Sequence, residues 1–302
     1  MSVRRRIVIT GANGQLGRLL LPALSGTYDL AAIVRSAGAL ARLAKRVGPE
    51  IAAAVHCCDP WNADSLRSAV GRCDAIVHLV GTIRETSRNR FRHAHEAAAE
   101  AVSRLAGDTG CRHLIYISIL GADHPGDLEI LQRRLAVEQY LRDAIECVTT
   151  IRVPMVLGAG DRASRALARS ASRRVSVLFG GDSLEQPIYA QDLIAAITNA
   201  IERGAGEHGT FNLAGPTVLT RRELVQRVAS VLNTSPILLS APFAPALAFA
   251  RFGERFKNPA PLQSEMLRLL DHDDNIDPMP AAGALGIELT SLDDFLPRCI
   301  RQ

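Results

Sequence analysis

Three glycines at intervals of three residues offer the first chemistry in this sequence. They lie in RIVITGANGQLGRLLLPAL, between a segment typical of a strand and one typical of a helix. Glycine permits a tight turn, lets backbone N–H groups approach a pyrophosphate, and lets the helix pack closely on the strand. The sequence therefore predicts a dinucleotide-binding loop, with a ligand-free glycine turn as the alternative. The expected contacts are Gly11, Asn13, Gly14, Gln15, Leu16 and Gly17.

The segment after the second predicted strand indicates which dinucleotide binds. No Asp or Glu lies between Leu30 and Pro49, so the carboxylate that usually accepts from the ribose hydroxyls of NAD is missing. Arg35 instead ends the segment LAAIVR. A guanidinium at this position suits the 2′-phosphate of NADP, since its planar donors match phosphate oxygens. We expect NADP(H) to be favoured over NAD(H), with a merely solvated Arg35 as the alternative.

Further cofactor contacts are expected beyond the carboxyl ends of the other strands, where ligands of parallel sheets bind. Asp59 is placed to accept from the adenine amino group, or else it is an ordinary turn residue. The other expected contacts lie at or just after the ends of the segments AIVHLV, HLIYIS and VTTIRV. They are Val80, Gly81, Thr82, Ser118 and Pro154.

A parallel sheet is needed to bring these residues together, and the first half of the chain predicts one. Segments typical of strands are RIVIT, LAAIVR, IAAAVH, AIVHLV, HLIYIS and VTTIRV, and helical patterns at 15–24, 39–47, 63–70, 90–107 and 127–144 lie between them. This alternation is typical of a sheet with helices on both faces. We expect a Rossmann-type doubly wound α/β domain over residues 1–155. A smaller cap region is expected over 156–302, with segments that return to the main sheet.

Composition argues against several other classes of protein. The 302 residues are 47% apolar and 22% charged, and no apolar segment approaches the ~20 residues that cross a bilayer. Scattered arginines and only 4% aromatic residues argue against nucleic-acid binding. The acidic segment 271–274 lacks the glycine of a calcium loop, and we interpret it as solvated. We expect a cytoplasmic protein without a metal site or a nucleic-acid partner.

Taken together, these segments resemble the atypical and extended short-chain dehydrogenase/reductase superfamily. The resemblance is in particular to bacterial relatives of the NAD(P)H-binding accessory subunit of respiratory complex I (alpha subcomplex subunit nine). It covers nearly the whole chain and rests on ITGANGQLG, HLVGTIRET, FRHAHEAAAEAV, HLIYISILGAD, RVPMVLGAGDR, QPIYAQDL and FNLAGPTVLTRREL. It implies nicotinamide dinucleotide binding with one of three roles: a structural or redox-sensing role, an oxidoreductase or epimerase activity, or a nucleotide-regulated partner-binding role.

The family's catalytic Tyr-x-x-x-Lys pair has no counterpart here. The resemblance places Ser118 at the family's first serine, Ile130 at the tyrosine and Arg134 at the lysine, with Glu138 as the expected anchor of Arg134. The family's tyrosine protonates a carbonyl oxygen, and isoleucine has no proton to give. Arginine can still hold ribose hydroxyls. Tyr189 is the weak candidate for a substitute acid, with a packing role as the alternative.

Two further expectations concern apolar segments. Residues 243–256, FAPALAFARFGERF, contain half of the chain's phenylalanines. We expect a lid over the cofactor cleft, or else contact with a partner protein or the periphery of the inner membrane. A cleft lined by Ile119, Ile130 and Met155 would favour an apolar small molecule, lipid-like or quinone-like.

Overall fold

A seven-stranded parallel sheet forms the centre of the computed structural model, which describes residues 4–81, 93–256 and 264–301. Its strand order is β11-β6-β5-β4-β1-β2-β3. This order reverses direction at β1, as in doubly wound folds whose ligands bind at the reversal. The strands are β1 (Arg6–Thr10), β2 (Asp29–Val34), β3 (Val55–Cys57), β4 (Ala75–His78), β5 (His113–Ile119), β6 (Cys147–Val153) and β11 (Gly209–Asn212).

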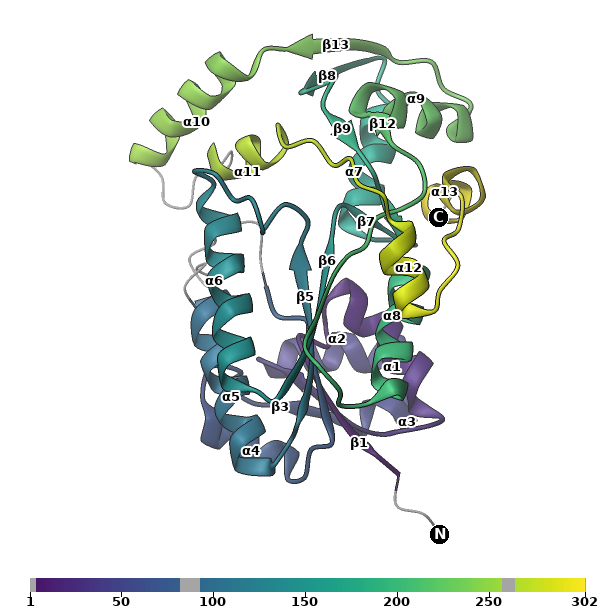
Figure 1. Cartoon of the computed structure of the whole chain (residues 1–302). Coiled ribbons are helices and arrows are strands. Elements are labelled where there is room, and N and C mark those ends of the chain that lie inside the picture. Colours follow the sequence, from purple (N-terminus) through teal and green to yellow (C-terminus); the bar gives the residue numbers. More distant parts are fainter. Residues whose placement is uncertain (1–3, 82–92, 257–263, 302) are drawn as a thin grey trace.

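Helices cover both faces of this sheet, so the predicted Rossmann-type α/β class is confirmed. One face bears α4 (Ala63–Val70), α5 (Ala98–Thr109) and α6 (Glu129–Ala144), and a π-helical turn (His93–Ala97) precedes α5. The other face bears α1 (Gln15–Ser25), α2 (Ala37–Val47), α8 (Ala190–Arg203) and α12 (Met279–Leu285) (Figure 1). Alternate residues of β1 serve the two sides: Ile7 and Ile9 pack on the second face, and Val8 packs on the first.

One predicted strand is wrong in part. We expected a strand over residues 51–56, whereas the chain forms the short helix α3 (Pro49–Ala52) before β3. Gly48 adopts φ +83°, and Pro49 at the first helical position has the φ that a helix requires. The alanines after Ile51 have high helix propensity, so the apolar run divides between a helical turn and a short strand.

The second half of the chain forms a smaller region above the carboxyl ends of the strands (Figure 1). Its core lies between α7 (Arg162–Ala171), α9 (Arg221–Leu232) and α13 (Leu292–Ile300). Three segments after residue 156, namely α8, β11 and α12, pack on the main sheet or belong to it. The other elements are β7 (Val156–Leu157), β8 (Val175–Phe179), β9 (Leu184–Glu185), β10 (Ile188–Tyr189), β12 (Leu219–Thr220), β13 (Ile237–Ala241), α10 (Phe243–Phe256) and α11 (Ser264–Leu269).

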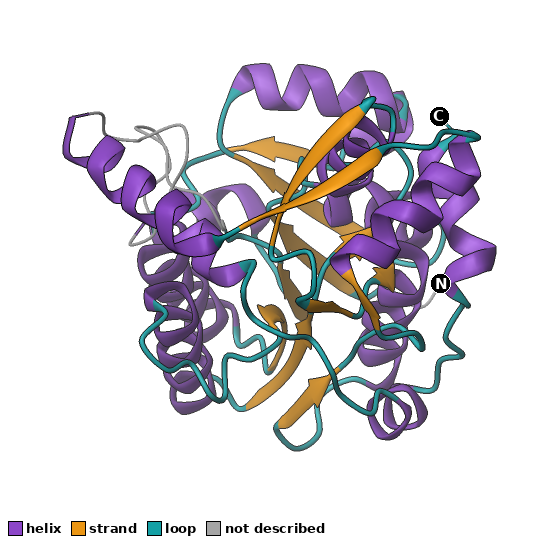
Figure 2. Ribbon diagram, turned by 90° about the horizontal axis from the view of Figure 1, so that it is seen from above, coloured by secondary structure: helices purple, strands orange, loops and turns teal. Residues whose placement is uncertain are grey.

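The segment 243–256 does not form the expected lid. It is the helix α10, which follows the two-stranded β8–β13 ribbon and extends outward from the rest of the protein (Figure 2). Phe249 and Phe252 are 71% and 64% exposed. Neither of the two hollows beside the glycine loop is lined by a residue of α10. Within the described ranges, no helix combines the length and apolarity needed to cross a membrane.

Candidate nucleotide-binding cleft

The glycine loop has the backbone geometry that phosphate binding requires. Gly11 turns out of β1 with φ +73°, and a Cβ there would lie 3.1 Å from the carbonyl carbon of Leu79. A Cβ on Gly17 would lie 2.6 Å from the Cα of Ala12, so only glycine lets α1 pack this closely. No side chain caps the N-terminus of α1 at Gly14. Its first N–H groups therefore remain available to an anionic ligand.

A large cleft opens between this loop and the smaller region. Its volume is about 570 Å³. The glycine loop and the ends of β4, β5 and β6 form one side, and α7, β9, α9 and the segment 269–274 form the other. The predicted cofactor residues that line it are Gly11, Gly14, Gln15, Leu16, Gly17, Gly81, Ser118, Arg134 and Pro154.

A smaller hollow of about 170 Å³ adjoins the glycine loop on the side of β2. Predicted residues that line it are Asn13, Arg35 and Val80, together with Gly11, Gly14 and Gly81. Trp61 lines it as well and was missed, although it follows the predicted Asp59 by two residues. Asp59 itself is not a lining residue; its Oδ1 accepts from the backbone N–H of Trp61 at 3.0 Å. Asp59 thus shapes the turn that presents the indole to the hollow.

Arg134 is held rigidly at the carboxyl end of β5. Its Nη1 donates to the hydroxyl of Tyr116 at 2.7 Å and to the carbonyl oxygen of Ile117 at 3.3 Å. A Cβ on Gly81 would overlap the guanidinium, so a larger residue at position 81 would displace Arg134 from this position. The expected anchor is wrong: Glu138 pairs with Arg152 instead, at 2.6 Å. Arg152 is a buried cation on the adjacent strand β6, and its guanidinium donates hydrogen bonds to both carboxylate oxygens of Glu138.

Nε of Arg134 and Nε2 of Gln15 are buried donors on the cleft wall that have no hydrogen-bond partner within the described parts of the chain. A buried donor without a partner costs about 1–3 kcal/mol, so such groups commonly mark the place of a ligand. Ribose hydroxyls and phosphate oxygens are acceptors of the required kind. With the uncapped helix and the glycine cradle, these donors fit a dinucleotide.

His78 and Tyr116 form the floor beneath Arg134. The Thr10 hydroxyl and Nδ1 of His78 lie 2.8 Å apart, and the rings of His78 and Tyr116 lie 5.7 Å apart. Complete burial, assisted by the charge of Arg134, lowers the pKa of His78 to about 3. Burial likewise raises the pKa of Tyr116. Both groups therefore stay neutral around pH ~7 and support Arg134 rather than exchange protons.

Acid should destabilise the protein through His78. Its folded pKa is below the ordinary value near 6.5, so the unfolded chain binds more protons as the pH falls below ~6.5, and stability is lost. Between pH ~7 and ~4.5 this amounts to about 2–3 kcal/mol. Urea denaturation should show a shallower pH dependence for His78→Gln than for the parent. The exposed His124→Gln should keep the parent's slope; equal slopes for all three proteins would contradict the assignment.

The remaining predicted residues divide between the cleft wall and other parts of the protein. Ile130 does not line the cleft but is buried beneath it, packed with Leu131 and Ile119. Ile119 and Met155 are lining residues, as expected. Tyr189 stacks on Phe295, with ring centroids 5.2 Å apart, and does not line the cleft. Thr82 lies outside the described residues.

The interpretation of segment 271–274 as a solvated loop is wrong in part. Asp271 and Asp273 are exposed, but His272 and Asp274 line the large cleft. A Cβ on Gly121, just after β5, would overlap the imidazole of His272. The cleft therefore contains groups able to carry a proton, which the sequence argument did not foresee. The only available signal was polar residues in a predominantly apolar C-terminal segment. No set of three potential metal ligands occurs in the described part of the chain.

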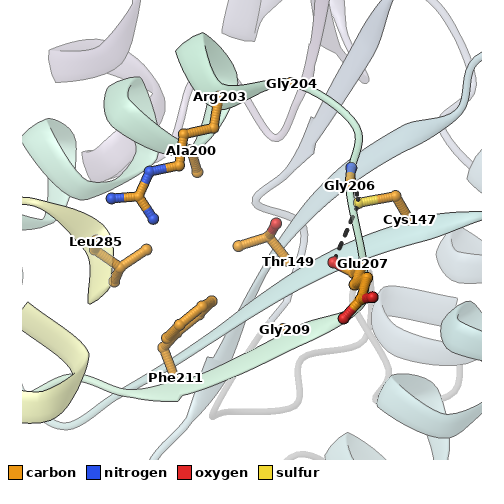
Figure 3. Close-up of a pocket in the computed structure, with 10 residues that line it drawn as sticks. All are labelled: Cys147, Thr149, Ala200, Arg203, Gly204, Gly206, Glu207, Gly209, Phe211 and Leu285. Carbon is orange, nitrogen blue, oxygen red and sulfur yellow. Dashed lines mark hydrogen bonds between the residues drawn. The ribbon is translucent and has the colours of Figure 1, made fainter.

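A separate hollow of about 210 Å³ lies at the amino ends of β6 and β11 (Figure 3). The thiol of Cys147 accepts from the Gly206 N–H at 3.2 Å and donates to the Glu207 carbonyl oxygen at 3.5 Å. Ligands of parallel sheets bind beyond the carboxyl ends of the strands, whereas this hollow lies at the amino ends. The cleft beside the glycine loop is therefore the candidate site.

Comparisons with known proteins indicate the class of ligand. The family model described as NAD(P)H-binding matches residues 11–174, more than half of the chain. The chain is 28% identical over 219 residues to the mitochondrial NADH dehydrogenase (ubiquinone) 1 alpha subcomplex subunit 9 of Arabidopsis thaliana. That match covers 70% of this chain and 54% of the relative, so the chain spans about half the relative's length.

Two further proteins extend the comparison. Ceramide reductase of Caulobacter vibrioides is 24% identical over 246 residues, covering 78% of this chain and 73% of that protein. The structure of UDP-glucose 4-epimerase from Bifidobacterium longum, in complex with NAD+ and UDP, has a TM-score of 0.73 at 14% identity. The overlap covers 98% of this chain and 97% of the epimerase, and shows a shared fold. The chain belongs to the NAD(P)H-binding family.

Proposed function

We propose that the protein binds NADP(H) in the large cleft and uses it without the family's Tyr–Lys chemistry, in a structural or redox-sensing role of the complex I accessory-subunit type. The observation that carries this proposal is the arrangement around Arg134. The guanidinium is held by Tyr116 and Ile117, and its Nε has no partner among the described residues. The buried Ile130 stands where the resemblance places the family's tyrosine. Arginine binds ribose hydroxyls without shuttling protons.

Bound dinucleotide would supply hydride when reduced, but the chain's own residues define the site. Gly11, Gly14 and Gly17 leave room for the pyrophosphate, and α1 directs its N-terminus towards it. Arg134 and Gln15 hold donors for ribose and phosphate oxygens. A ligand at a thousand times its Kd stabilises a fold by about 4 kcal/mol. A nucleotide bound this way can therefore serve as a structural part of the protein.

The preference for NADP(H) is a proposal that rests on Arg35. This residue lines the smaller hollow, and none of the described residues that line the hollow is a carboxylate. Arg35→Asp should weaken NADPH binding by roughly a hundredfold, because a phosphate contact is replaced by repulsion, and should strengthen NADH binding. Calorimetric titration of both nucleotides measures the change. Arg42→Asp on the neighbouring helix is the control, since Arg42 does not line the hollow. An unchanged NADPH to NADH ratio would refute the preference.

The accessory-subunit role predicts a protein partner. We propose that this chain is cytoplasmic and peripheral to the inner membrane. The exposed face of α10 is the surface that contacts the partner. Purification of the tagged chain from its own cells should recover a stable partner complex, and removal of nucleotide should weaken it. If the amount of complex recovered were the same with NADPH and with NADP⁺, the result would argue against redox sensing. Recovery of the chain alone, with bound nucleotide, would argue against the accessory role.

A second candidate function is reduction of an apolar carbonyl compound, lipid-like or quinone-like. The observation that favours it is the composition of the cleft wall, where His272 and Asp274 lie among apolar side chains. The name ceramide reductase of one relative is consistent with such a substrate. An assay of NADPH oxidation with long-chain ketones and quinones tests this candidate. Turnover well above that of a Gly17→Ala variant would favour this activity over the binding-only role. Absence of NADPH oxidation with every compound of a broad panel would count against it.

A further inference from the structure

A cluster of buried and half-buried side chains on the far wall of the large cleft has more carboxyl groups than guanidinium groups. Glu185 of β9, Arg221 of α9 and Asp274 all line the cleft there. Glu185 and Arg221 form an ion pair whose side chains are 5% and 11% exposed. One arginine thus lies near two carboxyl groups, of which Glu185 is buried and Asp274 is half-buried.

Every N–H of Arg221 is already engaged. Nε donates to Glu185 at 2.7 Å, and Nη2 donates to Glu185 and, at 2.7 Å, to the carbonyl oxygen of Leu270. Nη1 donates to the carbonyl oxygens of Phe179 at 2.6 Å and Gly180 at 3.4 Å. A guanidinium has five N–H groups, so these bonds exhaust it. No donor of Arg221 is left for a second carboxylate.

Asp274 is that second carboxyl group. Its backbone N–H donates to the carbonyl oxygen of Leu184 at 3.0 Å, but its carboxyl group receives no hydrogen bond from residues within the described ranges. Burial, and then the charge of Glu185, raises the pKa of Asp274 to about 7. The charge of Arg221 opposes this shift, and that of Asp273 adds to it. A proton-bearing carboxyl group therefore faces the cleft up to about neutral pH.

The surroundings of Asp274 define the kind of ligand that would meet it. His272 and Arg162 are the other polar side chains on the far wall besides the Glu185–Arg221 pair. Apolar side chains occupy much of the remaining wall between them and the glycine loop. They are Ile119, Leu120, Met155, Val156, Leu269 and Leu270. A ligand that fills this space is apolar and presents an acceptor to Asp274.

We propose that Asp274 donates a hydrogen bond, and during turnover its proton, to the carbonyl oxygen of an apolar ligand bound in the large cleft. This inference deepens the second candidate function and rests on it. A bound reduced dinucleotide would supply hydride to the carbonyl carbon, and the C=O π electron pair would move to the oxygen. The oxygen takes the proton of Asp274 to give an alcohol. The resulting carboxylate regains a proton from water.

The test measures binding of 2-octanone and of octane, which lacks the acceptor, to the full chain saturated with NADP⁺. Calorimetry near pH ~6 and ~8.5 compares the parent with Asp274→Asn, Asp274→Leu and, as the control, the exposed Asp271→Asn. The parent and Asp271→Asn should bind 2-octanone about tenfold more tightly at the lower pH, because Asp274 loses its proton at the higher one. Asp274→Asn should bind independently of pH, since an amide donates at both. Asp274→Leu should bind 2-octanone no better than octane.

Three outcomes would overturn the proposal: no measurable binding of 2-octanone at the lower pH, the same affinity at both pH values in the parent, or a pH dependence that survives in Asp274→Asn. Binding of NADP⁺ is measured beforehand in each protein. A chain that binds NADP⁺ and gives one of these outcomes refutes the role of Asp274 alone. A parent chain that does not bind NADP⁺ refutes the proposed function itself, and with it the ligand site built on that function.

Discussion

Replacing Arg221 with methionine is expected to lower the free energy of unfolding by about 3–5 kcal/mol, one of the two largest effects predicted here. The arginine is buried and is the ion-pair partner of Glu185. It also bonds three backbone carbonyl oxygens, which tie α9 to the end of β8 and to Leu270. Its removal leaves a buried carboxylate and several acceptors without partners. Urea denaturation near pH ~7 measures the loss.

The double variant Arg221→Met/Glu185→Leu is the matched control. Removing both charges avoids a buried unpaired ion, and apolar replacements of such pairs are often neutral. The double variant should therefore recover much of the stability that the single variant loses. A single variant as stable as the parent would show that the ion pair is not buried as described. A double variant no better than the single one would place the loss in the backbone contacts instead.

Replacing Gly17 with alanine should cost about 3 kcal/mol of stability and abolish nucleotide binding. The added Cβ would lie 2.5 Å from the carbonyl oxygen of Ala12 and 2.6 Å from its Cα. Both are backbone atoms of the loop, so α1 must move away from β1. This movement also withdraws the N-terminus of the helix from the phosphate position. Thermal unfolding and NADPH titration measure the two effects.

Gly107→Ala controls for the general effect of alanine in a helix. Gly107 lies within α5, and a Cβ there would meet nothing within 4 Å. Alanine at an unhindered helical position stabilises by about 0.5–1 kcal/mol, so the two substitutions should have opposite signs. If Gly17→Ala behaved like Gly107→Ala, the close approach of α1 and the loop would be wrong.

The sequence predicted the sheet and the position of the glycine loop because both depend on local patterns. Glycine spacing, apolar runs and their alternation are readable from neighbouring residues, and β1 occurs at the predicted residues 6–10. The register between strands then places Gly81, Ser118 and Pro154 on one cleft wall without further information. These residues lie at or just beyond the carboxyl ends of β4, β5 and β6, so their approach is a consequence of the fold class.

The far wall could not be predicted, because tertiary contacts between distant segments create it. Asp274 meets Glu185 and Arg221 only because the C-terminal segment returns across the smaller region. Glu138 illustrates the same limit, since the helical spacing of four residues predicted a pair with Arg134. The carboxylate bonds Arg152 of β6 instead. Which of two arginines a carboxylate meets depends on how a helix rotates on the sheet, which residue spacing alone leaves open.

The central claim is that this cleft binds a phosphorylated nicotinamide dinucleotide with the chain's own residues. The most direct measurement is calorimetric titration of NADPH into the purified chain after any bound nucleotide has been removed. We predict saturable binding at one site per chain, lost in Gly17→Ala and retained in Asp271→Asn. Absence of binding by the folded parent, for NADPH and NADH alike, would contradict the account.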